Sequence, residues 1–338
     1  MTAQNSKLQV SVVVPVRNEG ESIRALLEGL LGQTFAPTEI LITDGGSQDN
    51  TVEIIEEFIA GGAPLKLFRE TDSMPGHARN VGARNASCEW IAFTDAGTVP
   101  ARDWLEALVE KVSRDPDVDV VYGAFEPITD TLFKQCAVMA YLQPPALMED
   151  RLTPPPSIAS ALMRRAIWAT AGGFPGHLRS AEDLIFMERV AQHAARPVRA
   201  PRARVYWAIQ PTLWRTFKRF VTYARNNMRA GLWRQWQATV LARYGLLLLA
   251  ALPAIWFGWK WLLVPLSLWL LLLIARSFVA IRRYRQVYPA SVLKNFVRLA
   301  VLVPIMATLD SATILGTIQW LVADKIGGQG GAEAGNGK

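Results

Sequence analysis

Over the first two hundred residues, short runs of aliphatic residues alternate with amphipathic segments. The stretches "LQVSVVVP", "EILITD", "LKLFRE", "WIAFTDA" and "VDVVYG" predict buried strands. The segments between them predict helices, and Asn50 followed three residues later by Glu53 fits a capping box. This alternation predicts an α/β fold with a mostly parallel sheet covered by helices on both faces.

Three further segments complete this globular part. "YLQPPALMEDRLTPPPS" is rich in proline and is expected to form a loop over the site. "AEDLIFMERVAQHA" predicts a helix, and "RPVRAPRARVYWA" predicts a basic edge strand.

The later part of the chain is dominated by apolar residues. Gly245–Trp259 and Trp261–Ala275 are uncharged runs separated by Lys260. A membrane span needs roughly 20 residues, which each run reaches if Arg243 and Arg276 extend outward to the membrane surface. Tryptophans cluster between the two runs, as in an aromatic belt. A buried helical hairpin is the alternative interpretation.

A third apolar stretch, "RLAVLVPIMATLDSATILGTIQWLV", is long enough for another span. Asp310 in its middle is expected to face a neighbouring helix, because an unpaired carboxylate is costly in lipid. The basic loop Arg282–Tyr288 favours the cytoplasmic side. Before the spans, "TLWRTFKRFVTYARNNMRAGLWRQW" has the pattern of an interfacial helix, with a docked surface helix as the alternative.

These patterns predict four regions. They are a globular domain at 1–208, amphipathic interfacial helices at 209–237, a transmembrane region at 238–325 with spans near 240–259, 261–281 and 298–322, and a flexible tail at 326–338.

Composition refines the picture. Hydrophobic residues make up 51% of the 338 residues, and the formal net charge is +7. Basic residues beside apolar segments favour anionic lipid as a partner and argue against nucleic acid. The two cysteines, Cys88 and Cys136, argue against a disulfide framework and suit a reducing compartment. The N-terminus lacks the pattern of a signal peptide, so the globular part is expected in the cytoplasm.

Acidic residues stand at the predicted strand ends, where ligands bind in parallel sheets. Asp44 follows one strand and Glu19 follows the first, so together they favour a nucleotide pocket, although either alone fits a turn or cap acid. Arg79 and Asn80 open a helix rich in small residues, and Arg79 could meet a diphosphate there. An ordinary surface arginine is the alternative. No Walker-type loop or Rossmann glycine fingerprint is present.

A single acid, Asp95, ends the strand in "WIAFTDAGTVP". Enzymes that handle nucleotide diphosphates often place two acids here, one residue apart, to hold a divalent metal. In this chain the second position is Gly97, which has no side chain. The interpretation we prefer is Mg²⁺ or Mn²⁺ held by Asp95, the diphosphate and water. The alternative is a strand-end aspartate without a metal role.

Taken in order, "SVVVPVRNEGESI", "ILITDGGSQDNT", "GHARNVGARNA", "FTDAGTVP" and "AGGFPGHLRSAEDLIFMERV" resemble glycosyltransferase family 2 over about residues 9–235. The resemblance implies the GT-A fold, which is Rossmann-like, a nucleotide-diphosphate sugar donor, and inversion at the anomeric carbon. The family's processive synthases carry a Gln-x-x-Arg-Trp motif that is absent here, which favours transfer of one sugar.

The resemblance also implies roles for individual residues. Asp44 resembles the acid that contacts the base, Arg79 a neighbour of the diphosphate, and Asp95 the first acid of the Asp-x-Asp motif. Glu182 and Asp183 resemble the acidic pair that includes the catalytic base. The expected nucleotide-sugar-binding residues are Pro15, Val16, Glu19, Asp44, Arg79 and Asp95.

The sequence therefore predicts an inverting glycosyltransferase anchored in the cell (inner) membrane by several spans, with its catalytic domain in the cytoplasm. A UDP-sugar is the favoured donor, and the acceptor is expected to be lipid-linked or a cell-envelope glycan. Asp183 would deprotonate the acceptor hydroxyl. The alternatives are a non-catalytic, nucleotide-binding membrane subunit of an envelope polysaccharide complex and a nucleotidyltransferase, whose basic phosphate-binding loop is missing.

Overall fold

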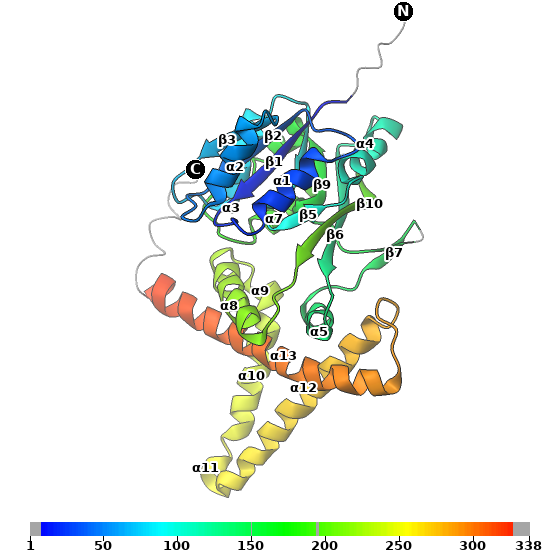
Figure 1. Cartoon of the computed structure of the whole chain (residues 1–338). Helices are drawn as coiled ribbons and strands as arrows, with labels where there is room; N and C mark the ends of the chain where they lie inside the picture. The colour runs from blue at the N-terminus through cyan, green and yellow to red at the C-terminus, as the bar shows by residue number, and fades with distance from the viewer. Residues whose placement is uncertain (1–7, 150, 194–195, 327–338) are drawn as a thin grey trace, which may run out of the picture. The chain divides into compact units, whose positions relative to one another are not determined.

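The computed structural model describes residues 8–149, 151–193 and 196–326, which belong to two compact units (Figure 1). The sheet unit comprises Met1–Ile128 and Pro145–Ala208, and the helical unit comprises Thr129–Pro144 and Ile209–Lys338. The segment 129–144 thus groups with the later helices, although the sequence analysis placed it within 1–208. The flexible tail predicted for 326–338 lies outside the described residues, except for Ile326.

The sheet unit is built on an eight-stranded sheet with the order β3-β2-β1-β4-β9-β6-β10-β5. Its strands are β1 Val10–Val16, β2 Glu39–Asp44, β3 Leu65–Arg69, β4 Trp90–Phe93, β5 Thr98–Pro100, β6 Val120–Ile128, β9 Ala161–Arg164 and β10 Pro197–Ala208. A separate antiparallel hairpin pairs β7 Ala146–Met148 with β8 Arg151–Thr153, within the segment predicted as a proline-rich loop.

Strands β3, β2, β1 and β4 run parallel, and β9 is antiparallel to β4 and β6. The chain leaves β1 toward β2 on one side, and β4 is the neighbour on the other side. Such a reversal of strand order opens a crevice beyond the carboxyl ends of the strands. The predicted α/β sheet is therefore confirmed, and its switch point lies between β1 and β4.

Both faces of the sheet are covered, because side chains alternate between the faces along each strand. Val12 and Val14 of β1 belong to one core cluster, and Val13 belongs to the other. The first core is closed by α1 Ile23–Leu31, α2 Thr51–Ala60 and α4 Trp104–Arg114. The second is closed by α3 Pro75–Asn85, α6 Arg165–Thr170 and α7 Glu182–His193, with the short helix η1 Ile158–Ser160 beside them.

Two local predictions were wrong. Asn50 is the N-cap residue of α2, but its side chain makes no capping bond, so the capping box does not form; the Thr51 amide instead donates to Asp49 Oδ1 at 3.1 Å. The basic strand β10 is not at the edge, since it pairs with β6 on one side and with β5 on the other. The edge position falls to the three-residue strand β5.

The described part of the helical unit consists of helices joined by turns. They are α5 Leu132–Tyr141, α8 Leu213–Arg229, α9 Trp233–Trp236, α10 Ala238–Ala251, α11 Ala254–Phe257, η2 Trp259–Leu262, α12 Leu263–Arg283, α13 Val292–Gln319 and the π-helical segment η3 Trp320–Ile326. Figure 1 shows α10 and α12 as the two arms of a hairpin with α11 at its tip. A β-carbon at Gly316 of α13 would lie 2.4 Å from the Val221 carbonyl oxygen of α8, so the glycine permits the close packing of these two helices.

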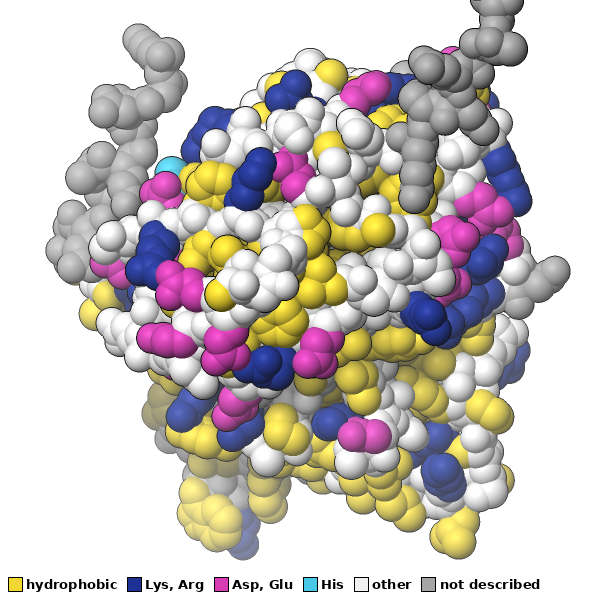
Figure 2. Space-filling view, turned by 45° about the horizontal axis from the view of Figure 1, so that its top comes forward, with side chains coloured by type: hydrophobic (Ala, Val, Ile, Leu, Met, Phe, Trp, Pro, Cys, Tyr) yellow, Lys and Arg dark blue, Asp and Glu magenta, His cyan; other side chains and the backbone are white. Residues whose placement is uncertain are grey.

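Within the described part of this unit, three segments are long and apolar enough to cross a membrane: Ala238–Phe257, Trp259–Arg283 and Val292–Ile326. Many apolar side chains of the hairpin are exposed, with Ile255 at 75% and Trp256 at 76%. The space-filling view shows hydrophobic side chains gathered in patches on the surface, next to Lys and Arg side chains (Figure 2).

The carboxylate of Asp310 is 2% exposed and faces the neighbouring helices, as expected. Arg243 of α10 lies 3.1 Å from Asp310 Oδ2, and Arg276 of α12 lies 2.6 Å from the same atom. Tyr244 donates its hydroxyl to that oxygen as well, at 3.3 Å. The two arginines therefore pair with Asp310 and do not extend outward, so charge pairing joins all three helices at the base of the hairpin.

Candidate active site

The parallel strands bring the predicted nucleotide-binding residues to one edge of the sheet. Pro15 and Val16, at the buried end of β1, lie in register with Thr43 and Asp44 at the end of β2. The Gly45 amide donates to the Val16 carbonyl at 2.8 Å and continues this pairing into the loop. Asp95 follows β4, the other neighbour of β1, by two residues. The strand ends of β1, β2 and β4 thus supply the residues that the motifs singled out.

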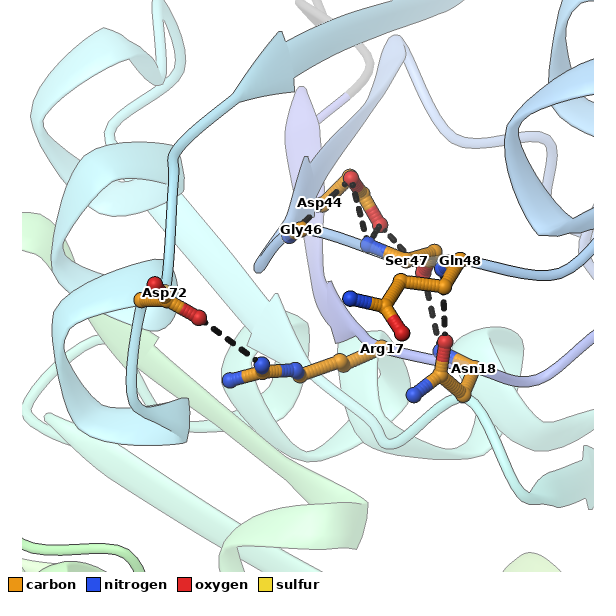
Figure 3. A network of polar contacts seen from close by, with 7 residues as sticks. All are labelled: Arg17, Asn18, Asp44, Gly46, Ser47, Gln48 and Asp72. Atoms are coloured by element: carbon orange, nitrogen blue, oxygen red, sulfur yellow. Dashed lines mark hydrogen bonds and ion pairs between the residues drawn. The ribbon is translucent and has the colours of Figure 1, made fainter.

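Asp44 shapes the loop that follows it (Figure 3). It is 4% exposed, and its carboxylate accepts from the backbone amides of Gly46 and Ser47 at 3.1 Å and from the Ser47 hydroxyl at 2.5 Å. These bonds are those of a turn acid, the alternative that the sequence left open. They fix the position of the carboxylate at the crevice.

The β1 and β2 loops are joined by Asn18, which adopts a left-handed backbone with φ of 55°. Its amide donates to Ser47 Oγ, and its Oδ1 accepts from the Gln48 amide, both at 2.8 Å (Figure 3). Arg17 extends from the same turn to Asp72 at 3.0 Å. Sequence reasoning did not single out Arg17, Asn18 or Ser47. The polar runs "RNEG" and "GGSQDN" were the available signal, but a run does not reveal its partners.

Arg79 occupies the centre of the site. It is 5% exposed and donates from Nη2 to Asp95 Oδ1 at 2.6 Å and from Nη1 to Glu182 Oε1 at 2.7 Å. Its guanidinium carbon also lies 5.4 Å from the centre of the Phe174 ring. The flanking carboxylates raise the pKa of Arg79 above its usual value, against the opposing effect of burial. The surface-arginine alternative is wrong, because this side chain bridges two of the predicted site acids.

The neighbouring Asn80 holds the loop that leads to the acidic pair. Its Nδ2 donates to the Phe174 carbonyl at 2.8 Å, and its Oδ1 accepts from the Phe174 amide at 2.9 Å and from Trp168 Nε1 at 3.1 Å. A β-carbon at Gly76 would lie 2.3 Å from the Pro175 carbonyl oxygen, so a glycine is needed for α3 to approach this loop. Sequence reasoning quoted Asn80 within its motif but did not find this positioning role.

Glu182 and Asp183 begin α7 and differ in their surroundings. Glu182 is 5% exposed; its Oε1 pairs with Arg79, whereas its Oε2 has no hydrogen-bond partner in the described part of the chain. Asp183 is half-buried, and burial followed by the charge of Glu182 raises its pKa to about 6, although Arg79 opposes the shift. The stabilisation expected from the helix N-terminus is therefore outweighed. Glu182, by contrast, lies in an ion pair with Arg79.

Asp95 is the residue predicted to bind a divalent metal. Its backbone carbonyl accepts a hydrogen bond from Thr98 Oγ1 at 2.6 Å. Among residues 8–149, 151–193 and 196–326, no group of three or more His, Cys, Asp or Glu side chains is placed to hold a metal ion. Mg²⁺ commonly takes one or two protein carboxylates and completes its shell with substrate phosphates and water. Asp95 fits such a partial set, with one oxygen already engaged by Arg79.

Known proteins resemble this chain in sequence and in fold. Residues 11–167 match the family model described as "Glycosyl transferase family 2". The chain contains a glycosyltransferase family 2 domain. It is 31% identical to the glycosyltransferase AglE of Haloferax volcanii over 186 residues, which are 53% of this chain and 60% of AglE. It is 33% identical to the uncharacterized glycosyltransferase YibD of Escherichia coli over 116 residues, 34% of this chain and 33% of YibD.

The fold agrees with this family. The mannosyltransferase PcManGT from Pyrobaculum calidifontis, solved in complex with GDP-Man and Mn²⁺, aligns with a TM-score of 0.54 at 21% identity, covering 93% of this chain and 87% of PcManGT. The sheet unit accordingly has the GT-A fold that the motifs implied. The chain spans 60% of the length of AglE and a third of that of YibD. The similarity to these relatives is therefore limited to part of each protein.

Proposed function

We propose that this protein transfers a sugar, with inversion, from a nucleoside-diphosphate donor to a lipid-linked or cell-envelope glycan acceptor at a membrane. The observation that carries the proposal is the Arg79 bridge between Asp95 and Glu182. It joins the acid that would face the leaving diphosphate to the acidic pair that would face the acceptor. The guanidinium of Arg79 thus orients one acid on the donor side and one acid on the acceptor side of the reaction.

The donor would bind beyond the ends of β1, β2 and β4. Asp44, oriented by its own loop, would accept a hydrogen bond from the base, and Pro15 and Val16 would line the pocket. PcManGT was solved with GDP-Man, and TarS 1–349 of S. aureus, with a TM-score of 0.50 and 20% identity, was solved with UDP. These neighbours support a nucleotide sugar as the donor, and we retain a UDP-sugar as the favoured one.

The acceptor hydroxyl would lose its proton to Asp183. Its oxygen would then bond to the anomeric carbon while the bond to the diphosphate oxygen on the opposite face breaks. A carboxylate with a pKa of about 6 is largely ionised at neutral pH yet more basic than an ordinary aspartate, which suits a general base. Glu182, in its ion pair, would hold Arg79 in place.

Charge on the leaving diphosphate has to be stabilised. Arg79 would supply its Nη2 once the diphosphate competes with Asp95 for that nitrogen, while Nη1 stays paired with Glu182. A divalent metal at Asp95, as Mn²⁺ is present in the PcManGT complex, would supply Lewis-acid stabilisation of that charge.

A membrane location is part of the proposal. The exposed apolar side chains of the α10–α12 hairpin would be costly in water and favourable in lipid. Helix α8 carries Trp214 and Lys218 on its surface, a combination suited to a membrane interface. The basic loop Arg282–Tyr288 favours the cytoplasmic side for this end of the hairpin.

The test is transfer from labelled UDP- and GDP-sugars to a lipid extract by full-length protein in detergent, with Asp183→Asn as the matched variant. We expect labelled lipid and free nucleoside diphosphate with the wild type, and little of either with the variant. Nucleotide binding without transfer would favour the non-catalytic subunit. Release of pyrophosphate from a nucleoside triphosphate and a sugar phosphate would favour the nucleotidyltransferase.

A further inference from the structure

The family motif calls for a second acid at the position of Gly97, so the space beside this residue is informative. A β-carbon built on Gly97 would meet the two carboxylate oxygens of Glu19, at 3.7 and 3.8 Å. No other atom of the described residues, apart from the chain neighbours, lies within 4 Å of it. The Glu19 carboxylate therefore lies where a side chain at position 97 would project.

Glu19 reaches this place from another strand end and is held there. Its backbone amide donates to Thr51 Oγ1 at 2.8 Å, and its carbonyl accepts from the Ser22 and Ile23 amides at the start of α1. The Ser22 hydroxyl donates to its carboxylate. A side chain so restrained loses little conformational entropy when it binds a cation.

The charges around Arg79 favour an added cation. Asp95 and Glu182 share its single guanidinium, with Asp183 next to them. One oxygen of Glu182 is buried without a hydrogen-bond donor among the described residues. Negative charge exceeds positive charge in this part of the site, and a divalent cation would reduce the excess.

We propose that Glu19 replaces the missing second acid, so that a divalent cation is held between Asp95 and Glu19 and completed by the donor diphosphate and water. This inference rests on the proposed function, since the diphosphate is one of the ligands. Two carboxylates with substrate phosphate are an ordinary ligand set for Mg²⁺, and Mn²⁺ accepts the same oxygens. The second carboxylate would thus come from Glu19 in the loop after β1, and not from position 97 in the loop after β4.

The swap can be tested directly, because Gly97 can accept a side chain. Its φ lies outside the left-handed region, and the predicted contacts of a β-carbon are ordinary van der Waals distances. The variants are Glu19→Gln, Gly97→Asp and the double variant, with Glu21→Gln as a control that removes an exposed charge from the same turn. Mn²⁺ binding to full-length protein in detergent is measured by electron paramagnetic resonance with saturating UDP or GDP, and nucleotide affinity is measured in chelator.

We expect Glu19→Gln to weaken Mn²⁺ binding by about tenfold or more, with nucleotide affinity in chelator nearly unchanged. The double variant should return Mn²⁺ affinity to within a few-fold of wild type, and Glu21→Gln should match wild type. Gly97→Asp alone should bind Mn²⁺ more tightly, which keeps the proposal testable if Glu19→Gln folds poorly, as judged by its melting temperature.

Unchanged Mn²⁺ affinity in Glu19→Gln would overturn the proposal. A loss that Gly97→Asp does not rescue would also overturn it and would assign Glu19 to the nucleotide itself. If wild-type protein binds neither UDP nor GDP, with or without Mn²⁺, the proposed function is wrong and the metal assignment falls with it. The first two results would contradict only the role of Glu19 in metal binding, whereas the third would contradict the proposed function, so the two proposals can be tested apart.

Discussion

At the scale of single residues, Asp183 combines two properties that are usually opposed. It begins a helix, where a carboxylate is stabilised, yet burial and Glu182 raise its pKa to about 6. If it is the base, kcat/KM should fall as pH decreases through about 6, because protonation removes the acceptor for the hydroxyl proton. A pH profile of transfer measures this limb. Constant activity down to pH 5 would exclude Asp183 as the base.

The same shift has a consequence for stability. Since the folded pKa exceeds the ordinary value of 3.8, folding favours the protonated form. The contribution of Asp183 to stability is therefore greatest below pH 4 and is lost as pH rises through about 6. Asp183→Asn cannot ionise, so its melting temperature at pH 8 should equal or exceed that of wild type while transfer drops about 10² or more. A variant that melts markedly lower would point to a structural role.

Arg79 gives a second prediction at this scale. Lys has one ammonium in place of the guanidinium fork and cannot hold Asp95 and Glu182 together in the same way. Breaking a buried pair typically costs about 3–5 kcal/mol, so Arg79→Lys should lower both the melting temperature and the affinity for UDP. Arg24→Lys is the matched control, because its pair with Glu57 is exposed. Equal behaviour of the two variants would contradict the bridging role.

The sequence predicted which residues belong to the site, but it did not predict which of their side chains contact one another. Asp44 and Asp95 could be placed at one edge because parallel strands end together. The partners of Arg79 lie 16 and 103 residues away, a separation that no local pattern encodes. For the same reason the sequence could not distinguish a buried, bridging arginine from a surface one. The proximity of Glu19 to Gly97 likewise depends on two loops meeting after the sheet has formed.

At the scale of elements, α8 and α13 depend on a glycine. A β-carbon at Gly316 would lie 2.4 Å from the Val221 carbonyl oxygen and 2.7 Å from Ala224 Cβ. Gly316→Ala should therefore separate the helices and destabilise the helical unit by about 1–3 kcal/mol, despite the better helix propensity of alanine. Gly245→Ala in α10 is the control, because its β-carbon would have open space. Thermal unfolding in detergent should show a loss for the first variant and none for the second.

Some element boundaries followed from local patterns, whereas β6 runs five residues beyond the predicted stretch, to Ile128. The strand β2 matches its predicted stretch, Glu39–Asp44, residue for residue. The position of β10 was not predictable in this way, because a basic, alternating strand looks like an edge strand until β5 covers its outer side. Asn50 is the N-cap residue of α2 as predicted, but its side chain makes no capping bond, and the Thr51 amide donates to Asp49 of the preceding loop.

At the scale of the whole molecule, hydropathy indicated the number and length of the apolar segments but not how their charges are satisfied. The sequence required Arg243 and Arg276 to extend outward for each arm to reach a full span. The structure pairs both with Asp310, so about 15 uncharged residues lie between this ion cluster and Lys260 in each arm. A membrane span needs roughly 20 residues, so the segments long enough to cross, Ala238–Phe257 and Trp259–Arg283, include the arginines of the cluster. In the membrane-embedded hairpin that we propose, the ion cluster would lie just inside the membrane surface, where pairing lowers its cost.

The membrane contact of the hairpin is the last prediction. Leu248 of α10 and Leu271 of α12 are 71% and 61% exposed, so a lysine at either position has little to disturb in the fold. In lipid each charge would cost about 2.5–3.5 kcal/mol near the centre of a span. Full-length protein should stay with membranes in alkaline carbonate, and Leu248→Lys combined with Leu271→Lys should shift it toward the soluble fraction. Leu147→Lys in β7, at 69% exposure in the sheet unit, is the matched control and should not shift it. Wild-type protein that is released by carbonate, or a double variant that stays bound, would mean that the hairpin faces another protein surface and not lipid.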